Sequence, residues 1–162
     1  MRRIIHRREL VADDARYPGE EGGPGARTVQ PAGEFITARS AGEPIEPAAA
    51  ILIGPTDEVE LLAPHLAHLS LIVVEFPKIG EGRGYSQARM LRQRYGYAGE
   101  LRARGALKRD QLYFLARCGF DSFDLDPAED LQAALGAFNV FSVAYQDGSD
   151  AVVQVRRRTA SA

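Results

Sequence analysis

Short apolar runs alternate with amphipathic segments through most of the chain, and this alternation predicts the fold. Two runs, Ala48–Ile53 and Leu71–Phe76, are almost continuously apolar, as expected of strands that are covered on both faces of a parallel sheet. Further strands are predicted at Glu100–Gly105 and Phe120–Leu125, with a short fifth strand at Phe141–Tyr145.

Segments with helical periodicity follow each of the first four strands. After the first strand, Val59, Leu62 and Leu66 fall on one helical face, which Pro64 interrupts. The later helices are predicted to follow the glycines of residues 80–84, to cover Arg109–Cys118 and to begin at Asp126.

Four consecutive βα units predict an α/β protein with a mostly parallel sheet of four to five strands. Such units fit half of a TIM-like barrel, and they equally fit a flavodoxin-like three-layer sandwich, because the pattern does not determine strand order. We expect a single α/β domain over residues 48–146. Residues 1–47 are expected to form a poorly ordered extension, because they contain a stretch rich in Gly, Pro and Glu, and residues 147–162 a tail. Within the extension, Ile4–Ile5 and Glu9–Val11 could form a short edge strand or a hairpin.

Composition places the chain among ordinary globular proteins. It has 162 residues, of which 45% are hydrophobic and 26% charged, and its net charge is −2. A single cysteine excludes an internal disulfide framework and fits a reducing compartment. No apolar run approaches the roughly 20 residues of a membrane span, so we expect a cytoplasmic protein without a membrane partner.

Positive charge is concentrated in the middle of the chain. Residues 78–117 contain ten Lys or Arg residues and three Asp or Glu residues. Such a basic segment in an otherwise acidic chain suits an anionic small molecule or an acidic protein partner. Nucleic acid is disfavoured, because the sequence lacks a helix-turn-helix, a zinc finger and an aromatic platform among the arginines.

A glycine-rich loop between the second strand and its helix is the best candidate site. Gly80, Gly82 and Gly84 are spaced two apart, which matches neither the dinucleotide-binding fingerprint nor a P-loop. A helix that follows a parallel strand presents its amides and partial positive charge at the carboxyl edge of the sheet, where anions bind. We expect the loops after the second, third and fourth strands to converge at this edge, with Arg83 and Arg109 as the main donors.

The candidate ligand-binding residues share a position near this edge or a side chain suited to an anion. They are Lys78, Gly82, Arg83, Gly84, Tyr85, Ser86, Arg89, Arg102, Arg109, Asp110 and Gln111. No catalytic residue is assigned. No metal site is predicted either, because His65 and His68 lack a cysteine or carboxylate partner, and Cys118 is interpreted as a buried structural cysteine.

A family resemblance is carried by two stretches, FPKIGEGRGYSQARMLRQRYGYAGELRARG and RDQLYFLARCGFDSFDL. Over about Ile51 to Tyr145 the chain resembles the bacterial domain-of-unknown-function family numbered 934. The chain departs from the family pattern at Ala106, where members have an acidic residue, and at Glu81, where they commonly have Asp. The resemblance implies a small bacterial protein linked with sulfite reductase and other assimilatory sulfur genes, often labelled an oxidoreductase of sulfite reduction.

Three functions remain open from the sequence. The preferred one is an accessory protein of assimilatory sulfite reduction, and thus of cysteine biosynthesis, with an anion-binding edge and a sulfite reductase or another sulfur-assimilation protein as partner. An oxidoreductase of sulfite reduction is the second, although no nicotinamide, flavin or iron-sulfur motif identifies a cofactor. The third is a degenerate βα domain with a structural role only.

Overall fold

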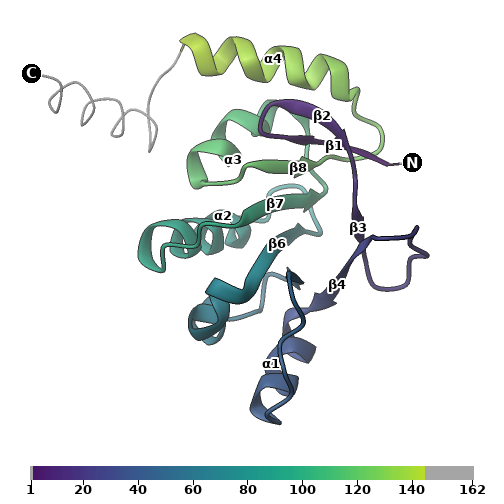
Figure 1. Cartoon of the computed structure of the whole chain (residues 1–162). Helices are drawn as coiled ribbons and strands as arrows, with labels where there is room; N and C mark the ends of the chain where they lie inside the picture. Colours follow the sequence, from purple (N-terminus) through teal and green to yellow (C-terminus); the bar gives the residue numbers. More distant parts are fainter. Residues whose placement is uncertain (1, 145–162) are drawn as a thin grey trace, which may run out of the picture.

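The computed structural model describes residues 2–144, with side chains through residue 140. Within this range eight strands form one curled sheet in the order β2-β1-β8-β7-β6-β5-β4-β3, and α2, α3 and α4 lie along one side of it (Figure 1). The chain is therefore a mixed α/β protein with a mostly parallel sheet, as predicted. The sheet has more strands than the four to five expected.

Six neighbouring strands are parallel and follow one another in chain order. They are β3 (Ala15–Arg16), β4 (Arg27–Pro31), β5 (Ala49–Ile53), β6 (Leu69–Phe76), β7 (Glu100–Gly105) and β8 (Ser122–Asp124). An antiparallel hairpin of β1 (Arg3–His6) and β2 (Glu9–Ala12) extends the sheet beyond β8. This sequential order is that of a half-barrel and differs from a flavodoxin-like order, in which the first two strands exchange places.

The helices follow the strands much as the periodicity predicts. They are α1 (Ala32–Ser40), η1 (Val59–His68), α2 (Arg83–Arg89), η2 (Met90–Arg94), η3 (Arg109–Gln111), α3 (Leu112–Cys118) and α4 (Leu131–Ala144). Segment η1 is a 3₁₀ helix containing Pro64, which cannot donate the amide hydrogen bond of an α-helix. Within residues 2–144 no helix is long and apolar enough to cross a membrane.

Residues 1–47 differ most from expectation, because they contain β3, β4 and α1 rather than a poorly ordered extension, besides the β1–β2 hairpin that Ile4–Ile5 and Glu9–Val11 allow. Ile4, Ile5 and Phe35 are buried, so this segment contributes to the same core as the later units. Its strands are only two to five residues long. Runs this short carry too few alternating positions for a period to be recognised, and the glycines between them suggested a loop.

The predicted fifth strand is corrected as well. Residues 141–144 belong to helix α4, because Ala134 and Phe138 recur at helical spacing and are buried, which continues the helix through the apolar run. Tyr145 and the tail at residues 147–162 lie outside the described residues.

The two faces of the sheet bury different side chains. Ile72, Val74 and Phe76 of β6 pack under the helices in the main core. On the opposite, concave face, Leu71 and Val73 form a smaller cluster with Tyr17. Polar side chains continue this concave face across β7 and β8.

Candidate anion-binding edge

The carboxyl ends of β6, β7 and β8 lie side by side, as the sequence predicts. In the register of the sheet Phe76 pairs with Gly105, and Arg104 pairs with Asp124. The loops that leave these strands are also joined to one another. The amide of Ala106 donates to the carbonyl of Phe76 at 2.8 Å, and the amide of Asp126 donates to the carbonyl of Leu107 at 3.1 Å. The three loops therefore form one edge.

Two glycines at this edge are required by packing against Phe76. Gly105 has a φ of 125°, and a Cβ there would collide with the carbonyl oxygen of Phe76. A Cβ on Gly84 would overlap the Phe76 ring, so this glycine lets α2 approach β6 closely. By contrast, a Cβ on Gly82 would have no atom within 4 Å. Within the glycine loop, Gly84 is thus required by its contact with the strand, whereas Gly82 is not.

Three of the predicted cationic binding residues stand at the edge without a side-chain partner in the described part of the chain. Lys78, Arg83 and Arg109 are exposed. Among the described residues their ammonium and guanidinium groups make no hydrogen bond or ion pair. Their backbone positions are held, since the amide of Arg83 donates to Glu81 at 3.2 Å and the amide of Arg109 to Glu129 at 3.4 Å. Gly82, Ser86 and Asp110 are exposed in the same loops and helix starts.

Aromatic and amide side chains connect the neighbouring loops behind these cations. Gln111 donates from Nε2 to the Tyr85 hydroxyl at 2.9 Å, and its Oε1 accepts the amide of Lys108 at 2.9 Å. The Tyr85 ring contacts Phe114 with centroids 5.0 Å apart, and the Arg89 guanidinium lies 5.7 Å from the Phe114 centroid. Tyr85, Arg89 and Gln111 therefore hold α2 against α3, a supporting role for three predicted binding residues.

Arg102 is not part of the edge, although the sequence analysis includes it there. Its side chain is 1% exposed and lies on the concave face in the middle of β7. It donates to Asp13 and Glu100 at 2.7 Å each. It also donates to the Tyr17 hydroxyl at 2.9 Å. The structure thus separates Arg102 from Arg83 and Arg109.

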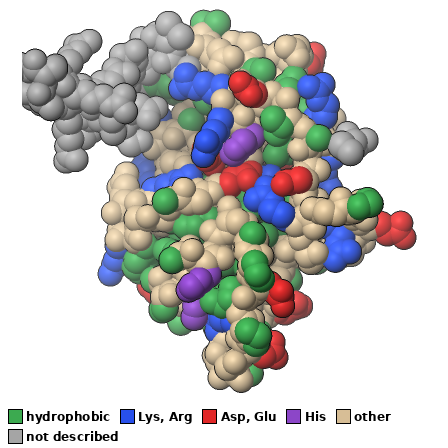
Figure 2. All heavy atoms as spheres, in the orientation of Figure 1, with side chains coloured by type: hydrophobic (Ala, Val, Ile, Leu, Met, Phe, Trp, Pro, Cys, Tyr) green, Lys and Arg blue, Asp and Glu red, His purple; other side chains and the backbone are tan. Residues whose placement is uncertain are grey.

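Arg102 belongs to a larger cluster that we call the concave-face network. Its members are Arg2, Asp13, Asp14, Tyr17, Glu20, Arg27, Glu100, Arg102, Arg104 and Asp124. Arg104 pairs with both Glu20 and Asp124 at 3.1 Å. In Figure 2, red and blue side chains are intermixed across the middle of the visible face, so part of the basic segment is neutralised by the N-terminal residues.

Burial and charge act in opposite directions on the titrating groups of this network. Burial alone raises the pKa of Glu100, but Arg102 and Arg27 outweigh it and hold that pKa at about 2. Burial raises the pKa of the Tyr17 hydroxyl to about 12, although Arg102 opposes the shift. Burial lowers the pKa of Arg102, but Tyr17, Glu100 and Asp13 outweigh it and raise that pKa. Arg102 and Glu100 are therefore both charged at neutral pH.

Neither the histidines nor the cysteine form a centre in the part of the chain that the structure describes. His65 packs edge-on against Phe35, with ring centroids 5.6 Å apart. Cys118 is buried at the end of α3. Across residues 2–144 no group of three or more His, Cys, Asp or Glu side chains could hold a metal ion.

Comparison with known proteins places the chain in a family. No curated protein matches the chain. The family model described as "Bacterial protein of unknown function (DUF934)" matches residues 50–155. That range begins in β5 and includes every strand and loop of the carboxyl edge, whereas β1 to β4 precede it. The chain therefore belongs to the DUF934 family of bacterial proteins.

Proposed function

We propose that the protein binds a small oxyanion at the carboxyl edge and serves assimilatory sulfite reduction as an accessory protein. The observation that carries the proposal is a set of three cations, Lys78, Arg83 and Arg109, which lie on adjacent loops of one sheet edge and whose charged groups have no partner within residues 2–144. Sulfate, sulfite, phosphate and a carboxylated tetrapyrrole all offer the oxyanion that such cations recognise.

The chemistry of the three side chains suits an oxyanion. A guanidinium group presents parallel N–H donors that match two oxygens of a sulfate or carboxylate, and a lysine adds a mobile point charge. Ligands of open α/β sheets commonly bind outside the carboxyl ends of the strands. Because the backbone amides of Arg83 and Arg109 already donate to Glu81 and Glu129, the ordering needed on binding is confined largely to the side chains.

The surface beside the cations supports an acidic protein partner. Ile79 and Phe114 are exposed large apolar side chains in the loop and helix that flank the site. Exposed apolar side chains close in sequence to exposed positive charge fit a partner surface that combines apolar and acidic groups. We propose a sulfite reductase or another sulfur-assimilation protein as this partner, following the link that the family resemblance implies.

Binding is tested by titration calorimetry at low salt with sulfate, sulfite and phosphate. We expect the Arg83→Ala/Arg109→Ala variant to lose about tenfold or more in affinity, because two charge-assisted contacts are removed. Arg94→Ala is the control, since Arg94 is also exposed but lies on η2. Equal affinity in the double variant and the wild type contradicts the proposed site.

Growth tests the link to sulfur separately. A deletion strain is expected to grow poorly on sulfate or sulfite and to recover with sulfide or cysteine. The Arg83→Ala/Arg109→Ala variant should reproduce the deletion, whereas Cys118→Ser should restore growth. Normal growth of the deletion strain on sulfate removes the sulfur link and leaves anion binding intact. Failure of a folded Cys118→Ser protein favours redox chemistry instead.

A further inference from the structure

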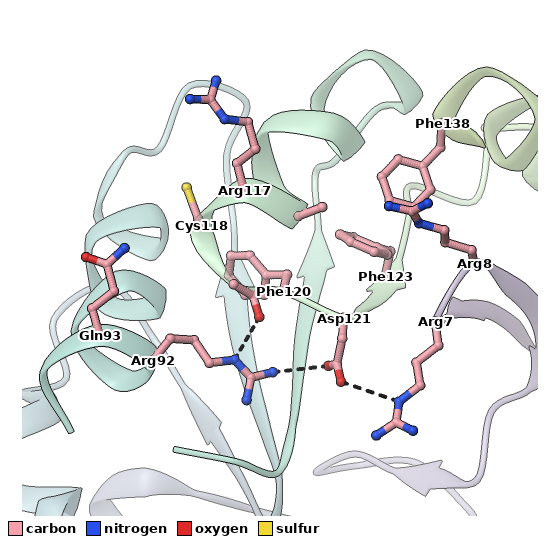
Figure 3. A pocket seen from close by; sticks show the side chains of 12 residues that line it. Arg7, Arg8, Arg92, Gln93, Arg117, Cys118, Phe120, Asp121, Phe123 and Phe138 are labelled. Atoms are coloured by element: carbon pink, nitrogen blue, oxygen red, sulfur yellow. Dashed lines mark hydrogen bonds and ion pairs between the residues drawn. The ribbon is translucent and has the colours of Figure 1, made fainter. Parts of the chain in front are cut away.

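A pocket lies at the amino-terminal end of β8, opposite the carboxyl edge. It has a volume of about 420 Å³ and is lined by residues of the β1–β2 turn, η2, the end of α3, the start of β8 and α4. Figure 3 shows Arg7 and Arg8 entering from the hairpin and Arg92 from the other side, with Asp121 between Arg7 and Arg92. This pocket is distinct from the carboxyl edge.

The wall of the pocket is aromatic. Phe120, Phe123 and Phe138 line it and are themselves almost fully buried. The rings of Phe123 and Phe138 pack edge to face with centroids 5.7 Å apart, which joins β8 to α4. An apolar group that enters the pocket therefore meets a fixed surface, and the volume lies within the range of small-molecule sites.

Arg92 has a structural role in this pocket. Its Nε donates to the carbonyl of Gly119 at 2.8 Å, and its Nη1 donates to the carbonyls of Tyr97 and Gly99 at the same distance. Its Nη2 lies 3.5 Å from Asp121. With every nitrogen engaged, Arg92 fixes the wall and leaves anion recognition to other residues.

Arg7 and Arg8 form the two-residue turn of the hairpin in an unusual conformation. Both have positive φ, 48° and 67°, as the central residues of a type I′ turn require. Asn-Gly is the preferred pair there, and branched or long side chains are disfavoured. The turn is anchored at the pocket, because the amide of Arg7 donates to the carbonyl of Asp121 at 2.9 Å.

The guanidinium groups of this turn keep most of their donors available. Arg7 is 76% exposed and makes a long ion pair of 3.9 Å with Asp121. Arg8 lies 5.3 Å from the centroid of Phe138, and among the described residues it makes no hydrogen bond. The Arg8 fork thus lies over the ring of Phe138, whereas the exposed Arg7 fork lies beside Asp121 and points away from the rings (Figure 3). Both stand in a turn whose backbone favours other residues.

We propose that this pocket binds an organic anion, whose apolar body lies against Phe138 while its phosphate or carboxylate group pairs with Arg7 and Arg8. The guanidinium forks supply the anion contacts, and the walls of the pocket, including the exposed edge of Phe138, supply the apolar contact. Neither part suffices alone, so an inorganic anion or a neutral aromatic molecule binds much more weakly than a molecule that combines both. The site does not depend on the carboxyl edge.

The test uses phenyl phosphate as the probe, with inorganic phosphate and phenol as its two halves, in calorimetry of the full chain carrying Arg83→Ala/Arg109→Ala, so that phosphate binding at the carboxyl edge does not contribute. Arg7→Asn/Arg8→Gly converts the turn to the preferred pair, so we expect a melting temperature equal to or above the wild type. Phenyl phosphate affinity should fall about tenfold or more. Arg8→Gln, which preserves the backbone of the turn and removes one charge, should give a smaller loss.

Arg3→Gln/Arg16→Gln is the matched control, because it removes the same charge from two exposed positions outside the pocket. It should leave phenyl phosphate binding unchanged. The proposal is overturned by any of three results in the Arg83→Ala/Arg109→Ala background: no binding of phenyl phosphate when the turn is intact, equal binding of either half, or equal losses in the control and the turn variant.

Discussion

Arg102 and Arg83 belong to the same basic segment, but the structure uses them in opposite ways. Arg102 is buried on the concave face and donates to Asp13, Glu100 and Tyr17. Arg83 is exposed at the carboxyl edge, and its guanidinium makes no hydrogen bond or ion pair within the described chain. The comparison teaches that local charge density does not identify a binding site. A binding site is identified by donors that are still available, and these are found by determining which cations already have partners.

The two arginines should also differ in what their removal costs. A buried ion pair adds little net stability compared with apolar packing, but removal of one partner leaves the other charge buried and uncompensated. Removal of an exposed arginine that has no partner leaves no buried charge uncompensated. Stability should therefore depend on the concave-face network, whereas binding should depend on the carboxyl edge.

The largest effect is expected from Arg102→Ala. This change leaves Asp13 and Glu100 without their 2.7 Å partner, and we expect a loss of about 3–5 kcal/mol in the free energy of unfolding. Arg83→Ala should change the same quantity by less than about 0.5 kcal/mol. Urea unfolding of both variants checks the contrast. Equal losses in the two variants would contradict it.

A smaller loss is expected from Gly105→Ala, which tests how firmly the backbone of the edge is held. The left-handed φ of 125° and the collision with the Phe76 carbonyl should cost about 1–3 kcal/mol. Gly82→Ala is the control in the neighbouring loop, since its φ is −90° and its Cβ meets no atom. Thermal unfolding compares them. A Gly105→Ala protein as stable as Gly82→Ala would show that the loop can relax.

Acid should weaken the concave-face network through Glu100. The pKa of Glu100 is lowered from 4.5 to about 2 in the folded protein, so the unfolded chain binds this proton first. The stability that this carboxylate contributes is full above pH 4.5 and is lost as the pH falls from 4.5 towards 2. We expect Glu100→Gln to flatten the pH dependence of unfolding in that window. An unchanged slope would remove Glu100 from the network.

Much of the parallel sheet could be predicted from the sequence. The apolar runs of β5 and β6 and the helix start at Arg109 carry local signals that do not depend on distant residues. The predicted start of the last helix at Asp126 is wrong, because α4 begins at Leu131, where the carboxylate of Asp130 accepts the amides of Gln132 and Ala133. The common edge followed from the parallel arrangement alone. The placement of Arg102 could also have been found, because Leu101 and Ala103 alternate with polar residues along β7, and that alternation assigns Arg102 to the face opposite the helices.

The partners of Arg102 could not be predicted in the same way. Asp13 and Tyr17 lie more than eighty positions away along the chain, in a segment of short strands and glycines. Their charges complement the basic segment, but one sequence contains no signal that pairs them. The Arg7–Arg8 turn could not be predicted from local sequence either, because two arginines are atypical at the centre of such a turn.

The most direct measurement follows the arginine side chains themselves. In an NMR titration of the labelled protein with sulfate at low salt, the Nε–Hε signals of Arg83 and Arg109 should shift and saturate together. The Nε–Hε signals of Arg102 and Arg104 should not shift, because these side chains are already paired with carboxylates. Shifts of equal size at all four arginines, or none at Arg83 and Arg109, would contradict an anion site at the carboxyl edge.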